Sequence, residues 1–239
     1  MLNFLIKIID FNYQRKKNIF LKKKFLNKID IFFDIGAHDG GTIKDLLKKF
    51  KISQIYAFEP SQNNFNKLNI QIKKIKKKKP EIKIETFLNG VGHKNEKIFL
   101  NEITDGTSNT FNNFNVESKY FKRKKFLFSY FGIKNYLRKK VETDIIPLDD
   151  FFNKRNIEKV DLIKIDTEGF EYNVLLGLKD KIKKIKFILF EHHYDNMIIK
   201  NYKFSDINNL LLKNGFKKSF KIKMPLRKSF DYVYENINL

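Results

Sequence analysis

The chain has 239 residues, and its 49 Lys and Arg against 27 Asp and Glu give a formal net charge of +22 at pH 7. This length suits one α/β domain with a full hydrophobic core. The sequence contains no cysteine, which excludes disulfides, thiolate metal sites and cysteine nucleophiles. No apolar run approaches the ~18 residues that a membrane-spanning helix needs.

The positive charge has two explanations. Only five of the cationic residues are Arg against 44 Lys, although Arg is the residue that makes bidentate contacts with phosphate and guanine. Lys, Ile, Asn and Phe are all frequent and share A/T-rich codons, so a base bias of the genome accounts for the charge. We therefore do not expect nucleic acid as a partner, while a basic surface for another anionic partner remains open.

Residues 1–29 are predicted to form an N-terminal helical extension, basic on one side, that leads into a domain over residues 30–239. The first nine residues are apolar apart from Asn3 and Lys7, and they lack a basic n-region and a small-residue cleavage site. We therefore expect no signal peptide and a cytoplasmic protein.

The first strand, helix and second strand of the domain are predicted at residues 31–35, 42–50 and 54–58. A glycine-rich turn joins the first strand to the helix, and the second strand ends at Glu59, 18 residues after Gly41. A carboxylate about 20 residues beyond such a turn can accept hydrogen bonds from two ribose hydroxyls. This unit therefore predicts a nucleoside-bearing cofactor.

The turn itself selects among such cofactors. The dinucleotide spacing Gly-x-Gly-x-x-Gly is absent because Gly36 is followed by Ala37, His38 and Asp39 before Gly40, and no Walker motif is present. Asp34 would repel a pyrophosphate but suits an ammonium group. These features favour S-adenosyl-L-methionine over NAD.

The rest of the domain alternates strands and helices, which predicts an α/β fold with a mostly parallel sheet covered on both faces. The helix at 205–213 has Ser205 as a candidate N-cap. Strands are predicted at 82–88, 97–100, 141–146, 161–165 and 186–190, helices at 62–76, 148–152, 171–178 and 205–213, and a terminal hairpin at 216–222 and 230–234.

Residues 111–140 do not follow this alternation, and we predict an insertion that forms a helical lid beside the site. Two alternatives remain open: an amphipathic helix packed on the domain, and a surface that contacts a membrane or an anionic substrate. The segment combines aromatic and basic residues, namely Tyr120, Phe121, Phe126, Phe128, Tyr130, Phe131 and Tyr136 with Lys122, Arg123, Lys124, Lys125, Arg138, Lys139 and Lys140.

Four segments resemble the FkbM family of S-adenosylmethionine-dependent methyltransferases: residues 33–40, 57–60, 89–92 and 164–171. The last one, from Lys164 to Glu171, is the most specific, and residues 145–151 also resemble the family's approach to the fourth strand. The resemblance implies a Rossmann-like class I methyltransferase with seven strands. It also implies methyl transfer to oxygen, here on a carbohydrate or glycan precursor. The 111–140 insertion and the short N-terminal region depart from the family and affect the acceptor side.

The predicted acidic pair of the site is Asp166 and Glu168, since Asp166 ends a strand at the carboxyl edge of the sheet, where such folds bind ligands. His192 is the rival general base, and of His192 and His193 only one can face the pocket because neighbours in a strand point to opposite faces. Each carboxylate also has an alternative to a catalytic role. Asp166 could orient the methionine moiety, and Glu168 could simply occupy the first turn of a helix. We expect no metal.

The cofactor residues follow the order of the motifs. The methionine end is assigned to Asp34 and the turn, the ribose to Glu59 with Pro60, and the adenine to the turn after the third strand; a polar loop at 107–109 is a further candidate. The predicted set is Asp34, Gly36, Ala37, His38, Gly40, Glu59, Pro60, Asn89, Gly90 and Val91.

Two other functions remain open. The first is RNA ribose 2′-O-methylation, for which Lys44, Asp166 and Glu191 are the candidate catalytic residues. Methylation of a nucleic-acid base is not expected, because the sequence has neither a cysteine nor the Asn/Asp-Pro-Pro-aromatic motif. The other is a non-catalytic membrane-surface module with a methyltransferase fold. We favour the enzyme, with a small-molecule or glycan substrate.

Overall fold

The computed structural model describes residues 2–104, 106, 108–130, 136–225 and 227–239. Phe131 of the predicted lid lies outside these residues, as do the side chains of Phe128 and Arg138. In the part of the chain that is described, no helix is long and apolar enough to cross a membrane.

The main sheet has seven strands in the order β3-β2-β1-β7-β8-β10-β9, which confirms the predicted fold class. Only β10 runs against its neighbours, because it pairs antiparallel with both β8 and β9. The strands are β1 (Lys28–Ile35), β2 (Lys51–Phe58), β3 (Lys83–Phe87), β7 (Val160–Ile165), β8 (Ile185–His193), β9 (Phe216–Lys223) and β10 (Ser229–Asn236).

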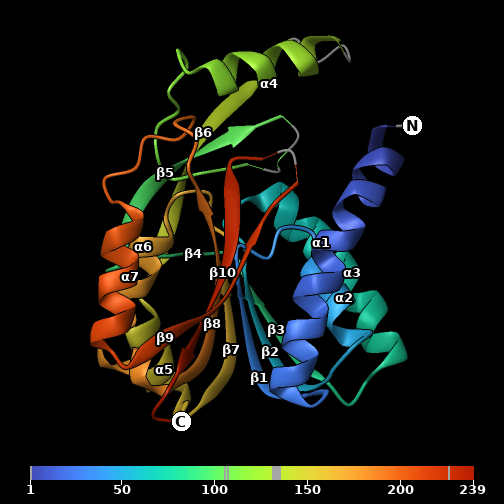
Figure 1. The fold of residues 1–239 in the computed structure, drawn as a ribbon, viewed down its shortest axis with the longest axis vertical. Coiled ribbons are helices and arrows are strands. Elements are labelled where there is room, and N and C mark those ends of the chain that lie inside the picture. The colour runs from blue at the N-terminus through green and yellow to red at the C-terminus, as the bar shows by residue number, and fades with distance from the viewer. Residues whose placement is uncertain (1, 105, 107, 131–135, 226) are drawn as a thin grey trace.

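Helices cover both faces of this sheet (Figure 1). One face carries α1 (Leu2–Phe25), α2 (Gly41–Leu47) and α3 (Gln62–Lys78), and the other carries α5 (Leu148–Arg155), α6 (Glu171–Leu176) and α7 (Phe204–Lys213) with a 3-10 helix at Lys179–Lys184. The central strands are apolar on both faces and form one hydrophobic cluster on each side of the sheet.

The predicted N-terminal extension is one continuous helix that shares the core of the domain. Leu21 and Phe25 of α1 are buried, and Phe20 stacks on Phe220 of β9 with 4.6 Å between ring centroids. At the other end of the chain, α7 begins at Phe204 instead of Ser205, because the Asp206 carboxylate accepts a hydrogen bond from the backbone N–H of Lys203 at 2.7 Å.

A second sheet, which the alternation did not predict, has the order β4-β6-β5. It consists of β4 (Gly90–Val91), β5 (Glu96–Ile103) and β6 (Leu137–Ile146), with helix α4 (Lys119–Tyr130) between β5 and β6. The segment 111–140 is therefore not one helical insertion, since its end belongs to β6. A small apolar cluster of Ile103, Phe121, Tyr136, Met197 and Ile198 holds α4 to this sheet.

Candidate functional site

The turn between β1 and α2 is shaped by close contact with neighbouring strand ends. Gly36 has φ +80°, and a Cβ there would overlap the backbone oxygen of Asp166 at the end of β7. The backbone N–H groups of Gly36 and Ala37 both donate to the carbonyl of Phe58, each at 2.9 Å. Only glycine combines this conformation with this approach, so the turn closes directly against β2 and β7.

Glu59, at the end of β2, is fixed by the same turn. Its Oε2 accepts from the backbone N–H of His38 at 2.8 Å, and its Oε1 accepts from the N–H of Ser61 at 3.0 Å. Burial raises the pKa of this carboxyl. Each carboxylate oxygen has lone pairs beyond the bond it already accepts, so Glu59 can still receive two hydroxyl donors.

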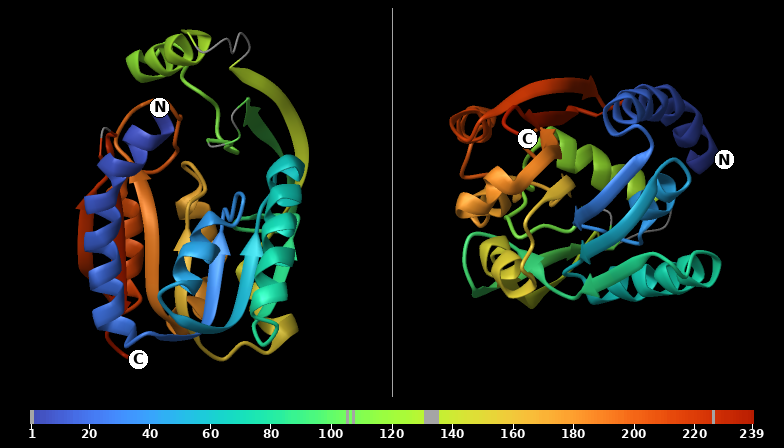
Figure 2. Two further views of the ribbon diagram at one scale, coloured as in Figure 1. Left: turned by 90° about the vertical axis from the view of Figure 1, so that its right-hand side faces the viewer. Right: turned by 90° about the horizontal axis from the view of Figure 1, so that it is seen from below.

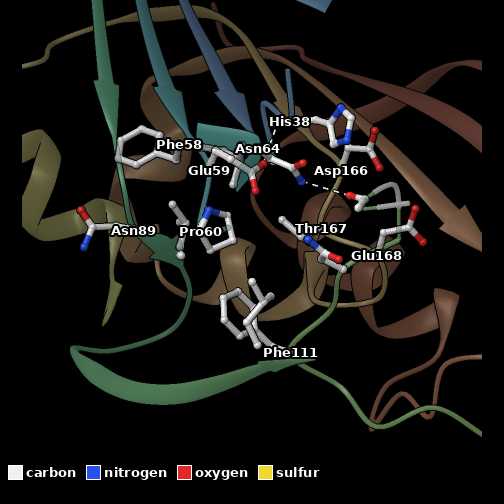
Figure 3. Close-up of a pocket in the computed structure, with 17 residues that line it drawn as sticks. His38, Phe58, Glu59, Pro60, Asn64, Asn89, Phe111, Asp166, Thr167 and Glu168 are labelled. Carbon is white, nitrogen blue, oxygen red and sulfur yellow. Dashed lines mark hydrogen bonds between the residues drawn. The ribbon is translucent and has the colours of Figure 1, made fainter. Parts of the chain in front are cut away.

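A pocket with about 580 Å³ of empty space lies where these strand ends meet the segment that follows β5 (Figure 3). The lining residues are Ile35, Gly36, His38, Phe58, Glu59, Pro60, Asn64, Asn89, Gly90, Val91, Leu100, Gly106, Asn109, Phe111, Asp166, Thr167 and Glu168. Seven of the ten predicted cofactor residues are therefore brought together, and so is the predicted acidic pair.

Three predicted cofactor residues do not line the pocket. Asp34 is 0% exposed, and its carboxylate lies 3.2 Å from the Nζ of Lys164, which is also 3.2 Å from Asp166. Burial raises the pKa of Asp34, so it is a buried partner of Lys164 and not the group that meets an ammonium. Ala37 belongs to the core, and Gly40 is the N-cap of α2.

The loop after β7 presents the acidic pair. Glu168 and Gly169 have φ +50° and +94°, a conformation that turns the chain sharply. The buried carboxylate of Glu171 holds this turn by accepting from the N–H groups of Thr167 and Gly169 at 3.2 and 2.9 Å. The Thr110 hydroxyl donates to the carbonyl of Glu168 at 2.6 Å. Both side chains of the pair consequently lie along the pocket.

Behind Glu168, one imidazole is surrounded by carboxylates. His193 Nε2 lies 3.2 Å from Oε2 of Glu168 and 3.2 Å from Oε1 of Glu191, and its Nδ1 lies 3.6 Å from Asp195. Burial disfavours the imidazolium, but Glu168 and Asp195 outweigh it and raise the pKa of His193 well above its usual value. Burial and the nearby Asp166 raise the pKa of Glu191 to about 8.

His192, the predicted rival base, is on the opposite face of β8, outside the pocket. It packs against the rings of Tyr194 and Phe204, with 4.8 and 5.5 Å between centroids. Burial lowers its pKa to about 3, so it stays neutral at physiological pH. His193, on the other face of β8, does not line the pocket itself but contacts Glu168, which does, and the sequence did not single it out.

Other pocket residues were also missed. Asn64 of α3 donates to the carbonyl of Gly106 at 3.0 Å, and Phe111 packs on Phe170 at 5.1 Å between centroids. No motif marks either residue: Asn64 lies on α3 after the second strand, and Phe111 follows β5 of the second sheet. Asn109 of the predicted polar loop does line the pocket, whereas Thr107 lies outside the described residues. Lys44 is exposed on α2 and is not among the pocket-lining residues.

The lining fits S-adenosylmethionine in its chemistry. Apolar walls for a purine are formed by Phe58, Val91, Leu100 and Phe111, and Glu59 supplies acceptors for a ribose. The carboxylates of Asp166 and Glu168 suit the positive ammonium and sulfonium groups at the other end.

Two solved structures share this fold. A methyltransferase FkbM from Methylobacillus flagellatus has 16% identity and a TM-score of 0.57 over 86% of this chain and 43% of its own. The magnesium protoporphyrin IX methyltransferase of Synechocystis, solved with bound SAM, has 8% identity and a TM-score of 0.52 over 97% of this chain and 81% of its own. The present chain thus spans less than half the length of the Methylobacillus protein. No curated protein matches the sequence.

The family model of the methyltransferase FkbM domain matches residues 34–218. This range begins at the end of β1 and ends in β9, so it contains the whole pocket and strands β2, β3, β7 and β8 of the main sheet. The resemblance of the four sequence segments is thereby confirmed. The chain belongs to the FkbM family of S-adenosylmethionine-dependent methyltransferases.

Proposed function

We propose that the protein is a cytoplasmic O-methyltransferase whose acceptor is a hydroxyl of a carbohydrate or glycan precursor. The observation that carries the proposal is the position of Glu168, a carboxylate at the pocket whose other neighbour is the buried imidazole of His193. A hydroxyl must lose its proton when it is methylated, and a positioned carboxylate is a suitable acceptor for it.

Different residues of the pocket hold the different parts of the cofactor. Glu59 receives the ribose hydroxyls, and Asn89, Gly90 and Val91 lie along the adenine. Asp166 faces the ammonium group in place of the buried Asp34. When bound, S-adenosylmethionine supplies an electrophilic methyl group on a sulfonium.

His193 has a positioning role in this proposal. As an imidazolium between Glu168 and Asp195, it fixes the position of the Glu168 carboxylate through a contact of 3.2 Å. Glu168 takes the proton that the acceptor hydroxyl loses, and positioning of the two reactants contributes several kcal/mol, on the order of 7 at the lower end for well-oriented groups.

The charge at the pocket favours a neutral acceptor. Asp166 and Glu168 together make this rim anionic, which opposes a phosphate backbone and suits sugar hydroxyls as hydrogen-bond donors. Against ribose 2′-O-methylation, Lys44 of its constellation is exposed on α2 and is not among the pocket-lining residues.

An acceptor screen tests this function. Purified protein with S-adenosylmethionine is offered free sugars, nucleotide sugars, lipid-linked saccharides and RNA, and release of S-adenosylhomocysteine is measured with Glu168→Gln as the blank. Turnover on a saccharide that disappears in the variant is expected. Turnover only on RNA, or on an amine, would overturn the proposed acceptor class.

A further inference from the structure

Helix α4 presents a face that is exposed among the residues that the structure describes. Phe121 enters the small apolar cluster, while Phe126, Leu127 and Tyr130 are 73%, 49% and 81% exposed. We call the exposed side of α4 the cap face; it consists of Lys119, Lys122, Arg123, Lys125, Phe126, Leu127 and Tyr130. Large apolar side chains gathered on one exposed face mark an interaction surface.

The same face is strongly positive. Helix α4 contains four Lys and one Arg and no acidic residue. Glu117, just before the helix, pairs with Lys122 at 2.6 Å, and Lys124 points inward to donate to Ser108 at 2.8 Å. Lys119, Arg123 and Lys125 therefore add their charges to that of the exposed Lys140 on β6, and helix α4 itself carries no carboxylate, whereas Lys139 pairs with Glu102 at 3.8 Å.

Beside the cap face lies a groove with about 850 Å³ of empty space. Its apolar and aromatic lining comes from Val116, Phe121, Tyr136 and Leu137. Its charged residues are Lys122, Lys125 and Glu117, and Glu117 pairs with Lys122. Apolar surface flanked by ammonium groups is the combination that accommodates an acyl chain together with an anionic headgroup.

The position of α4 links this surface to the site. The helix stands at one end of the long axis, beyond the carboxyl ends of the main strands, in two perpendicular views (Figures 1 and 2). Ser108, which accepts from Lys124, is next to Asn109 of the pocket lining. A surface that binds the cap face would therefore lie at the pocket end of the molecule.

We propose that the cap face docks reversibly on the surface of an anionic phospholipid bilayer, with Phe126 and Leu127 entering the interfacial region. Protein interfaces are depleted in Lys, and the single Arg of α4 offers little bidentate contact for RNA phosphates, whereas bilayers attract Lys and aromatic side chains together. Together with the proposed function, on which this inference rests, docking on a bilayer narrows the acceptor class to lipid-linked saccharides, which are presented at such a surface.

Co-sedimentation of the full chain with vesicles tests the proposal. Vesicles of phosphatidylcholine alone are compared with vesicles that contain about 30% phosphatidylglycerol, at low and physiological salt. Binding only to the anionic vesicles is expected, with affinity that falls as salt rises. Titration of the same samples with S-adenosylhomocysteine measures cofactor-product affinity separately from vesicle binding.

Matched variants locate the contact. Triple reversal of Lys119, Arg123 and Lys125 to Glu is compared with the same reversal of Lys73, Lys76 and Lys77 on α3, which are also exposed. Phe126→Ser with Leu127→Ser is compared with Ile70→Ser with Leu212→Ser, on α3 and α7, whose side chains are 56% and 51% exposed.

A loss of vesicle affinity of about tenfold or more in both α4 variants, and less than about twofold in both controls, is the expected result. Equal losses of vesicle affinity in the α3 and α4 charge-reversal variants would show that binding depends only on the net charge of the protein. This result would overturn the proposal. Binding of single-stranded RNA through the cap face without vesicle binding would overturn it as well. Retained S-adenosylhomocysteine binding in the variants keeps these outcomes separate from failure of the enzyme function.

Discussion

At the scale of single residues, the site depends on carboxylates with different partners. Asp34 is neutralised by Lys164, Glu59 is held by backbone N–H groups, and Glu168 faces the imidazole of His193. In the proposed function the same functional group serves as a buried partner of a lysine, a cofactor ligand and a proton acceptor, because its surroundings differ in each place.

Replacing Glu59 tests the cofactor assignment. Glu59→Ala removes two acceptors for the ribose, so the affinity for S-adenosylhomocysteine should fall by about 1 to 2 kcal/mol, from two hydrogen bonds of about 1 kcal/mol each. Calorimetric titration measures it, with circular dichroism as a check that the variant is folded. The exposed Glu158→Gln serves as control and should bind like the wild type.

Replacing Glu168 tests the proton acceptor. Glu168→Gln keeps the size of the side chain but removes its basicity, and turnover should fall by about 10²- to 10⁴-fold while S-adenosylhomocysteine affinity stays within about twofold. Turnover with the acceptor found in the screen and calorimetry provide the two readouts. Unchanged turnover would remove Glu168 from the mechanism and leave Asp166 as the candidate.

At the scale of elements, the pocket exists because the ends of β1, β2 and β7 approach one another closely. Gly36 makes the tightest of these approaches, against the backbone of Asp166. The second sheet then brings Leu100 of β5, and Asn109 and Phe111 beyond it, over the strand ends. The pocket is thus shared between the two sheets.

Gly36 and Gly41 belong to the same turn, and substitutions of the two test whether the close contact of Gly36 with Asp166 matters for stability. Gly36→Ala places a Cβ on a φ of +80° and against the Asp166 backbone oxygen, so the free energy of unfolding should fall by more than about 2 kcal/mol. At Gly41, the first residue of α2, the nearest atom to a Cβ is Oδ1 of Asp39 at 3.1 Å, and Gly41→Ala should change stability by less than about 1 kcal/mol. Urea denaturation compares them, and equal effects would contradict the assigned role of Gly36.

At the scale of the whole molecule, the cluster behind the pocket joins distant parts of the chain. Asp231 of β10 is opposite Glu191 in the sheet register and is bound by Tyr13 and Lys17 of α1, with Lys17 at 2.9 Å. The N-terminal helix, the last strand and the site are consequently coupled through buried charge. Folding stability should therefore depend on the protonation of this cluster.

The pH dependence of stability follows from the raised pKa of Glu191. Folded protein holds this proton up to about pH 8, whereas an unfolded glutamate releases it near 4.5, so the free energy of unfolding should fall as pH rises between these values. His193, whose pKa is also raised, adds a loss of the same sign above about pH 6.5. Asp166 and Asp195 have lowered pKa values, so their contributions are complete above pH 4 and constant in this window.

Glu191→Gln should flatten this slope by an amount on the order of a few kcal/mol between pH 5 and 8, as measured by chemical denaturation at each pH. The exposed Glu158→Gln provides the control and should keep the wild-type slope. A variant at position 191 with the wild-type slope would show that this carboxyl does not carry the dependence.

The sequence alone determined the features that local physics controls. Alternating apolar runs and glycine turns specify β1, α2 and β2 within about 30 residues, and these place Gly36, His38 and Glu59 at one edge of a parallel sheet. The specific octet at 164–171 identified the acidic pair in the same way, because a strand end and the loop after it are close in the chain. Family and cofactor class follow from these segments.

Only the tertiary structure decided what depends on contacts between distant residues. Lys164 neutralises Asp34, which lies 130 positions earlier in the chain. Strand β5 pairs with β6, which comes after α4 in the chain, so both strands belong to the second sheet instead of the main sheet. The choice of His193 over His192 depends on which face of β8 meets the loop of Glu168, and strand alternation alone leaves that orientation free. Burial and long-range pairing, which no local pattern encodes, turned a set of polar candidates into one site.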